Sequence, residues 1–261
     1  MKRSEINALM RDAKAFLTRR RFHLPPFARW TPADWAAKGP EVREIVENKL
    51  GWDITDFGRG DYRECGLLLF TIRNGSLANL RSGQGKTYCE KVMLVDVGQV
   101  TPMHFHWGKT EDIIVRGGGA LMIQLYNATP DDGLAESDVT VSVDGVRRTV
   151  RAGATLRLRP GESITLPSRL YHEFWGAESR VLVGEVSLVN DDEHDNRFYG
   201  QVGRFPAIVE DEPPLHLLVT DDEHDNRFYG QVGRFPAIVE DEPPLHLLVT
   251  DYGRYYRPEA S

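Results

Sequence analysis

The stretch that decides the fold is GQVTPMHFHWGKTEDIIVRGG, residues 98–118. It contains two histidines separated by one residue, and then a glutamate that opens a second apolar run. Because residues i and i+2 of a strand point to the same face, His104 and His106 are expected to project together while Phe105 faces the other way. A turn at residues 107–110 would return the carboxylate of Glu111 to the face that carries the histidines.

A third imidazole is expected from His172, which lies on a later predicted strand. Three imidazoles and one carboxylate are a ligand set that suits a first-row divalent metal. In an octahedral shell, four protein ligands leave two positions for a bidentate substrate or for two waters. An isolated His-x-His pair also fits hydrogen-bonded strand histidines, so the prediction depends on the spacing of the whole set.

From about residue 63 to residue 190 the sequence predicts an antiparallel β protein. Short runs rich in Val, Ile, Leu and Thr follow one another, and Asp144-Gly145 and Pro160-Gly161 are typical of tight turns between them. About eight to ten such strands with close turns favour an antiparallel barrel or jelly roll.

Helices are expected before the strands. Ser4 is expected to cap a helix that runs to about Arg19, and Thr31 to cap a short turn over residues 31–38. Pro40 is expected to open a further helix, which Gly51 can close. The fold class predicted from the sequence is therefore mainly β, with N-terminal α-helices packed on an antiparallel barrel.

The composition argues against a nucleic-acid-binding protein, a membrane protein and a secreted protein. The 261 residues include 39 acidic and 32 basic side chains, a net charge of −7 that argues against nucleic acid as a partner. No run approaches the roughly 18 apolar residues of a membrane span. The N-terminal segment carries Glu5 and Asp12 and has no apolar core, so we do not expect it to be a secretory leader. Cys65 and Cys89 are predicted to be free thiols in a reducing compartment, so we expect a cytoplasmic protein.

The sequence also contains a repeat. DDEHDNRFYGQVGRFPAIVEDEPPLHLLVT, at 191–220, recurs letter for letter at 221–250. Two identical copies do not make a solenoid, and the sequence alone leaves a tandem duplication, an engineered insertion and a sequence error open. We expect one copy to pack natively and the other to form an insertion, because each doubling of loop length costs only ~0.6 kcal/mol.

These observations divide the chain into three parts. We expect a helical segment at 1–60 that packs on the barrel, the barrel itself at 61–190, and a C-terminal wrap with the repeat at 191–261.

The spacing of Gly98, His104, His106, Glu111 and Gly118 resembles the first signature of the cupin superfamily at every fixed position. The second cupin signature is matched in part, by Gly161, Pro167 and His172. Arg169 stands where that signature has glycine, and Gly176 where it has asparagine.

Longer segments, among them HFHWGKTEDIIVRGGG, PSRLYHEFWG and GEVSLVNDDEHDNRFYG, resemble the D-lyxose isomerase family of cupins. The resemblance covers nearly the whole chain except one copy of the repeat. It implies a homodimeric, metal-dependent aldose–ketose isomerase, usually with manganese. The substrates it implies are D-lyxose and D-xylulose, and often D-mannose and D-fructose. The implied metal ligands are His104, His106, Glu111 and His172.

An isomerase of this kind needs a base for the carbon proton. Glu185 is the first candidate, because it shares a predicted strand face with Val181 and Val183; the alternative is an acid on the barrel exterior. Lys109, between two predicted ligands, is a candidate to donate to a substrate oxygen or to balance charge on an enediolate; the alternative is a solvated turn lysine.

Three further residues are candidates for substrate binding. Lys91 is followed by alternating apolar residues and is expected to point into the barrel, unless it lies at a sheet edge. Asp195 and Arg197 are expected to bind distal sugar hydroxyls or each other. The repeat offers the same pair at Asp225 and Arg227, and we choose the first pair because it follows the Glu185 strand directly.

Three other functions stay open at this point. A cupin phosphosugar isomerase would need a phosphate cradle of backbone N–H groups and basic residues. An oxygen-using cupin also employs three histidines and one glutamate, and a non-catalytic sugar-binding cupin would keep the barrel without the catalytic residues.

Overall fold

The computed structural model describes residues 1–191, 194–202 and 208–219. Its strands are β1 Gly51–Thr55, β2 Leu67–Arg73, β3 Tyr88–Val95, β4 Val100–His106, β5 Glu111–Asn127, β6 Val139–Val143, β7 Val146–Val150, β8 Thr155–Leu158, β9 Ser163–Leu166, β10 Leu170–Leu188 and β11 Asn196–Phe198. The helices are α1 Arg3–Arg19, α2 Pro32–Ala36, α3 Arg43–Glu47 and α4 Leu77–Ser82, with 3-10 turns η1 Pro26–Arg29 and η2 Pro40–Val42.

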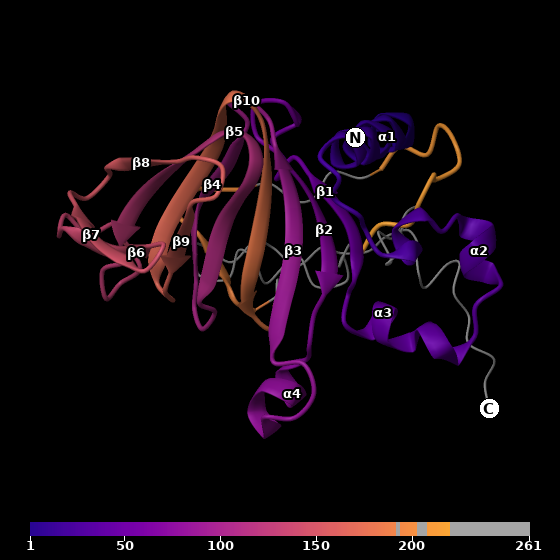
Figure 1. Cartoon of the computed structure of the whole chain (residues 1–261), viewed down its shortest axis with the longest axis horizontal. Coiled ribbons are helices and arrows are strands. Elements are labelled where there is room, and N and C mark those ends of the chain that lie inside the picture. The colour runs from indigo at the N-terminus through magenta and orange to yellow at the C-terminus, as the bar shows by residue number, and fades with distance from the viewer. Residues whose placement is uncertain (192–193, 203–207, 220–261) are drawn as a thin grey trace, which may run out of the picture.

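Two long strands, β5 and β10, organise the sheet. They pair antiparallel along most of their length, and all the strand pairs of the described part of the chain are antiparallel. The second half of β10 pairs with β3 and its first half pairs with β4. In β5, the first half pairs with β9 and the second half pairs with β8. Figure 1 shows α1, α2 and α3 beside β1 and β2, with β6 and β7 at the far end and α4 projecting from the body.

The long pair changes register near its middle. The shift lies between Ala177 and Val181 of β10, opposite Gly118 of β5. Gly118 has φ +94, and a Cβ there would lie 2.1 Å from the carbonyl oxygen of Arg180. Only glycine fits this close approach, and a β-bulge of this kind bends the strands it interrupts. The bulge thus separates the half of β10 beside β3 from the half beside β4.

Strand alternation produces two apolar cores. The first lies inside the sheet and includes Met93 and Val95 of β3 with Ile113 and Val183. The second lies between the sheet and α1, and includes the intervening Val92 and Leu94 with Ile6, Met10 and Phe16 of the helix. β3 therefore has one face in each core, and its interior face is the one that continues to Lys91.

Two expectations about the helices need correction. Ser4 does not cap α1: the helix starts at Arg3, and the Ser4 hydroxyl instead donates to Asp211. The helix expected from Pro40 is split into η2 and α3, and Gly51 opens β1 rather than closing the helix. Thr31 caps α2 as expected, by accepting from the amide of Asp34.

Both predicted tight turns are present. Asp144 and Gly145 join β6 to β7 with φ of +50° and +79°, values that the primed hairpin turns require. Gly161, with φ +98, lies between β8 and β9. The predicted fold class, mainly antiparallel β with N-terminal helices, is confirmed.

Residues 208–219, from the first copy of the repeat, dock on α1. Glu210 accepts two hydrogen bonds from the buried Arg3 guanidinium, and the Asn7 side chain donates to Glu212 and accepts from the Leu215 amide. Leu218 joins the α1 core. The second copy, 221–250, lies outside the described residues, and so does the predicted pair Asp225 and Arg227.

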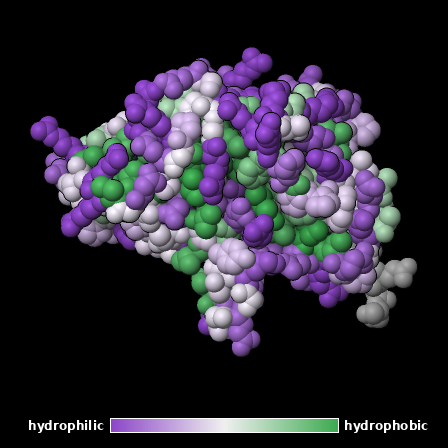
Figure 2. All heavy atoms as spheres, in the orientation of Figure 1, coloured by the Kyte–Doolittle hydropathy of each residue, from purple (hydrophilic) through white to green (hydrophobic). Residues whose placement is uncertain are grey.

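Most of the surface in the view of Figure 2 is hydrophilic, with apolar side chains gathered in patches over the sheet. Some of the exposed apolar residues lie at the α4 end of β3 and β10, namely Tyr88, Val186 and Leu188. Among the described residues, no helix is both long and apolar enough to cross a membrane.

The docked segment contains a titratable contact. His216 is 4% exposed; its Nδ1 lies 2.9 Å from the carbonyl oxygen of Trp30 and its Nε2 2.7 Å from Lys14 Nζ. With Nδ1 donating to the carbonyl, Nε2 accepts from the Lys14 ammonium, so this arrangement needs a neutral imidazole. Burial lowers the pKa of His216 below 6.5, and Lys14 lowers it further against the opposing effect of the Trp30 carbonyl.

This contact predicts that the packing of residues 208–219 on α1 weakens in acid. Below about pH 6.5 the unfolded chain binds the His216 proton more readily than the folded chain, so the folded state loses stability as the pH falls. We expect the free energy of unfolding to fall less between about pH 7.5 and about pH 5.5 in His216→Gln than in the wild type. Urea unfolding at both values measures this, with His246→Gln, the same change in the second copy, as the control. An equal pH dependence in the wild type and in His216→Gln would contradict the assignment.

Candidate metal centre and active site

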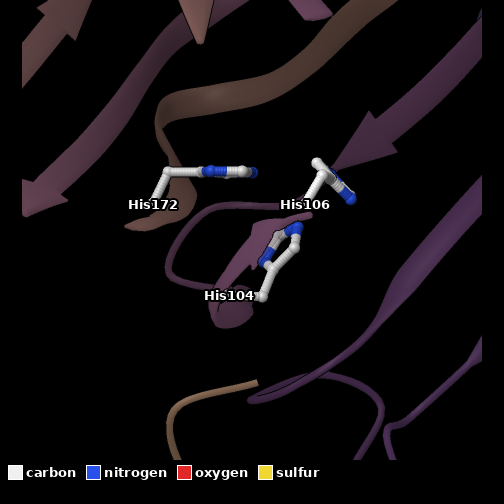
Figure 3. A group of neighbouring side chains, drawn as sticks. All are labelled: His104, His106 and His172. Atoms are coloured by element: carbon white, nitrogen blue, oxygen red, sulfur yellow. The ribbon is translucent and has the colours of Figure 1, made fainter. Parts of the chain in front are cut away.

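Three histidines from two neighbouring strands meet inside the barrel. His104 and His106 end β4, and His172 lies directly opposite His104 in β10. One ligand nitrogen of each ring lies within 4.8 Å of the others, and all three side chains are buried. Figure 3 shows the three rings facing a common space, as the His-x-His alternation predicts.

Backbone carbonyls fix two of these rings. His104 Nδ1 lies 2.7 Å from the carbonyl oxygen of Pro102, and His172 Nδ1 lies 3.0 Å from that of Leu170. A carbonyl only accepts, so each Nδ1 carries the proton and each Nε2 keeps its lone pair. A second hydrogen bond of this kind is how proteins orient metal-binding histidines.

Glu111 brings a carboxylate to the histidines from the start of β5. Its Oε1 lies 3.1 Å from His172 Nε2, and its Oε2 lies 3.4 Å from His106 Nε2. Glu111 Oε2 and His172 Nε2 are fully buried and make no aligned hydrogen bond with any described residue. Glu111 Oε2 has an ion pair with Lys109, but the lone pair of His172 Nε2 has no donor among the described residues, and a buried polar atom of this kind fits a site for a cation between the rings.

The predicted charge states suit metal binding. Burial lowers the pKa of His104 well below 6.5, and His172 and His106 lower it further. Burial, followed by Lys109, also lowers the pKa of His106. Burial alone would raise the pKa of Glu111, but Lys109 and His106 outweigh it and hold that pKa well below 4.5. At neutral pH the imidazoles of His104 and His106 are therefore neutral and the Glu111 carboxylate is charged, which are the forms that bind metal ions.

A second polar cluster adjoins the histidines. Lys109 Nζ lies 2.8 Å from Glu111 Oε2 and 2.9 Å from Glu185 Oε1. Lys91 Nζ lies 3.6 Å from the same oxygen of Glu185, which also accepts from the Ser187 hydroxyl. Each of these charged side chains is at most 6% exposed. The structure therefore brings Glu185, Lys109 and Lys91 together beside the metal ligands.

Sequence reasoning missed Asn190. Its Oδ1 accepts from Lys91 Nζ at 2.5 Å and lies 3.5 Å from Lys109 Nζ. Two hydrogen bonds to the Asn74 side chain, through the backbone N–H and carbonyl of Asn190, hold it in place. A polar residue just after the last long strand gives no spacing signal, so only the folded chain shows that Asn190 joins the two lysines.

Asp195 and Arg197 bond to different parts of the chain, and the Arg197 guanidinium donates to the carbonyl oxygen of Phe198. Asp195 accepts hydrogen bonds from the backbone amides of Gly108 and Lys109, in the turn between the metal ligands. In β11, Phe198 stacks on His104 with ring centroids 5.3 Å apart, so the neighbouring Arg197 points to the opposite face. The substrate-binding role of Arg197 stays a prediction that its placement does not favour.

Comparison with known proteins gives the family. A sequence model described as D-lyxose isomerase matches residues 1–221 and, a second time, residues 218–252. A D-lyxose/D-mannose isomerase of Serratia proteamaculans is 52% identical over 221 residues, which cover 84% of this chain and 96% of that protein. A second one, of Escherichia coli O157:H7, is 50% identical over 216 residues, which cover 82% and 94%.

The fold also resembles solved structures. An L-ribose isomerase of Cellulomonas parahominis, crystallised with L-ribose, aligns with a TM-score of 0.53 at 18% identity and covers 80% of this chain and 98% of its own. This likeness shows a cupin-type fold, and the family model and the two relatives show a sugar aldose–ketose isomerase. Within that class, the chain belongs to the D-lyxose isomerase family.

The histidine cluster predicts metal-dependent stability. An ion that binds only the folded chain raises stability by about 2.7 kcal/mol when it is present at about 100 times its Kd. We expect Mn²⁺ to raise the Tm of metal-stripped wild-type protein, and His172→Ala to weaken Mn²⁺ binding by at least about tenfold. Thermal unfolding and titration calorimetry measure both effects.

The matched control for this prediction is His23→Ala, because His23 is an exposed histidine outside the cluster. Its Mn²⁺ response should equal that of the wild type. An unchanged response in His172→Ala would show that the ion binds elsewhere.

Proposed function

We propose that the chain interconverts D-lyxose and D-xylulose, and also D-mannose and D-fructose, as a metal-dependent ketol isomerase. Membership of the D-lyxose isomerase family and two relatives of 50% identity or more named D-lyxose/D-mannose isomerase support these substrates. The observation that carries the metal dependence is the convergence of three buried imidazoles, whose ligand nitrogens lie within 4.8 Å of one another, with His172 Nε2 left without an aligned hydrogen bond to any described residue.

The proposed cofactor is Mn²⁺ or another first-row divalent ion, held by His104, His106, Glu111 and His172. Nitrogen ligands combined with one carboxylate suit such ions. When bound, the ion acts as a Lewis acid that polarises the carbonyl and the adjacent hydroxyl of an open-chain sugar.

Glu185 is the proposed base. The reaction needs a base to take the proton from C2 of the aldose and return it to C1 of the enediolate, while the hydroxyl proton moves from O2 to O1. Glu185 Oε1 is buried on the interior face of β10 and lies 2.9 Å from Lys109, which itself contacts the ligand Glu111. The link through Lys109 to the predicted ligand Glu111 supports Glu185 as the proton acceptor beside a sugar held at the metal ligands.

Two ammonium groups complete the proposed mechanism. Lys109 Nζ is placed to donate a hydrogen bond to the enediolate oxygen and to balance its negative charge. Lys91 lies 3.6 Å from Glu185 and is held by Asn190, so it is proposed to bind a neighbouring sugar hydroxyl. The barrel interior excludes bulk water from these groups, since all three are at most 6% exposed.

The sequence predicts that Asp195 and Arg197 bind distal sugar hydroxyls or each other, and the two backbone amides that Asp195 accepts from support a sugar contact less than they support a structural one. A homodimeric assembly and a cytoplasmic location follow from the family resemblance and from the composition, and both stay predictions.

The mechanism predicts the result of removing the base. Glu185→Gln keeps the size and the acceptor oxygen of the side chain but cannot take a proton at neutral pH. We expect kcat for D-lyxose to fall by about 10²- to 10⁴-fold, while the Mn²⁺-dependent rise in Tm is retained. The assay is ketose formation in metal-stripped protein with and without Mn²⁺; proton transfer also predicts deuterium uptake from D₂O at the sugar carbon.

The control variant is Glu90→Gln, a carboxylate of β3 that pairs with Arg73. It should keep wild-type turnover. Full activity of Glu185→Gln would remove Glu185 from the mechanism.

The same assay separates the proposed function from the other cupin functions. Turnover of D-fructose 6-phosphate alone would indicate a phosphosugar isomerase. Metal-dependent oxygen uptake would indicate an oxygen-using cupin. Sugar binding without turnover would indicate a non-catalytic binding protein.

A further inference from the structure

The turn between the two metal-ligand strands is held by a residue that follows β10 in the chain. Residues 107–110 join His106, the last residue of β4, to Glu111, the first of β5. Lys109 lies in this turn, and its ammonium contacts both Glu111 and Glu185. The backbone of one short turn therefore determines the positions of two predicted metal ligands, His106 and Glu111, and of Lys109, the proposed hydrogen-bond donor to the enediolate.

Three consecutive amides of this turn converge on one residue. The Trp107 N–H donates to the backbone carbonyl of Asp195 at 3.0 Å. The Gly108 N–H donates to Asp195 Oδ1 at 2.6 Å, and the Lys109 N–H donates to Asp195 Oδ2 at 3.0 Å. A carboxylate that accepts from two adjacent amides makes charge-assisted hydrogen bonds, which are stronger than neutral ones.

The same segment reaches the histidines. Directly after Asp195, β11 pairs with β4, so that Asn196 lies opposite His106 and Phe198 opposite His104. The Phe198 ring stacks on His104 at an interplanar angle of 29°. The segment at 194–198 thus touches the turn and the ligand strand together, and it belongs to the first copy of the repeat.

We propose that Asp195 is a positioning residue for Lys109, and that the first copy of the repeat completes the active site through it. This inference rests on the proposed function and refines it. Both carboxylate oxygens of Asp195 are engaged by the backbone, so its role is to fix the turn rather than to bind the sugar. Loss of the carboxylate would leave two amides unpaired and let the Lys109 ammonium move away from Glu185.

The test is Asp195→Ala, with steady-state kinetics on D-lyxose and hydrogen exchange of the peptide that spans residues 107–111. Displacing a catalytic group by about 1 Å costs on the order of 10²-fold, so we expect kcat to fall about 10- to 100-fold with KM little changed. The Gly108 and Lys109 amides should exchange faster. Asp195→Asn keeps one acceptor oxygen, so its kcat and its exchange rates should lie between those of the wild type and of Asp195→Ala. This variant tests the inference even if Asp195→Ala fails to fold.

The repeat supplies a matched control. Deleting 191–220 and deleting 221–250 give the same sequence, so deletion does not distinguish the copies, but point substitutions do. Asp225→Ala changes the same residue in an identical local sequence, and we expect wild-type kinetics and wild-type exchange.

Several results would overturn the inference. A rise in KM with unchanged kcat would make Asp195 a sugar contact. Equal effects of Asp195→Ala and Asp225→Ala would make the copies interchangeable, and unchanged exchange at residues 107–111 would show that the carboxylate does not hold the turn. Failure of the proposed function is separate: a wild type that turns over no free sugar would reject it, while the exchange measurement still decides whether Asp195 fixes the turn.

Discussion

A lysine ammonium held between two carboxylates inside a β barrel is the interaction on which the rest of this structure depends. Lys109 Nζ lies 2.8 Å from Glu111 and 2.9 Å from Glu185, and all three groups are buried. Removing isolated charges from water costs several kcal/mol each, so such a cluster persists only if every member is paired. Lys91 is a second cation beside Glu185, and the cluster contains two acids and two bases.

The barrel provides this arrangement through strand alternation. β3 and β10 each continue from an apolar interior face to one charged residue, Lys91 and Glu185, and these two residues are paired in the sheet register. β4 brings His104 and His106 to the site, β10 brings His172 and β5 brings Glu111, and Lys109 links Glu111 to Glu185. The apolar part of the interior gives the barrel its stability, and the polar end gives it a site that is shielded from water. A negatively charged enediolate would form next to two ammonium groups there, which is the electrostatic complementarity that catalysis needs.

Much of this site could be predicted from the sequence because strand residues have a period of two. That period aligned His104 with His106, and it placed Lys91 and Glu185 inside the barrel on the strength of their apolar neighbours. It did not find Asn190, because a residue after the end of a strand has no periodic partner. It also did not show the face on which Arg197 lies, since this depends on the register between β11 and β4. Ser4 was misassigned because its carboxylate partner, Asp211, is distant in sequence.

The central claim is that His104, His106, Glu111 and His172 hold one divalent ion inside the barrel. Anomalous diffraction from crystals of Mn²⁺-loaded protein, measured at the manganese absorption edge, tests it most directly. We expect a single strong peak among the three imidazoles, within bonding distance of a Glu111 carboxylate oxygen. Fully active crystals with no peak there, or with manganese only at acidic groups on the surface, would contradict it.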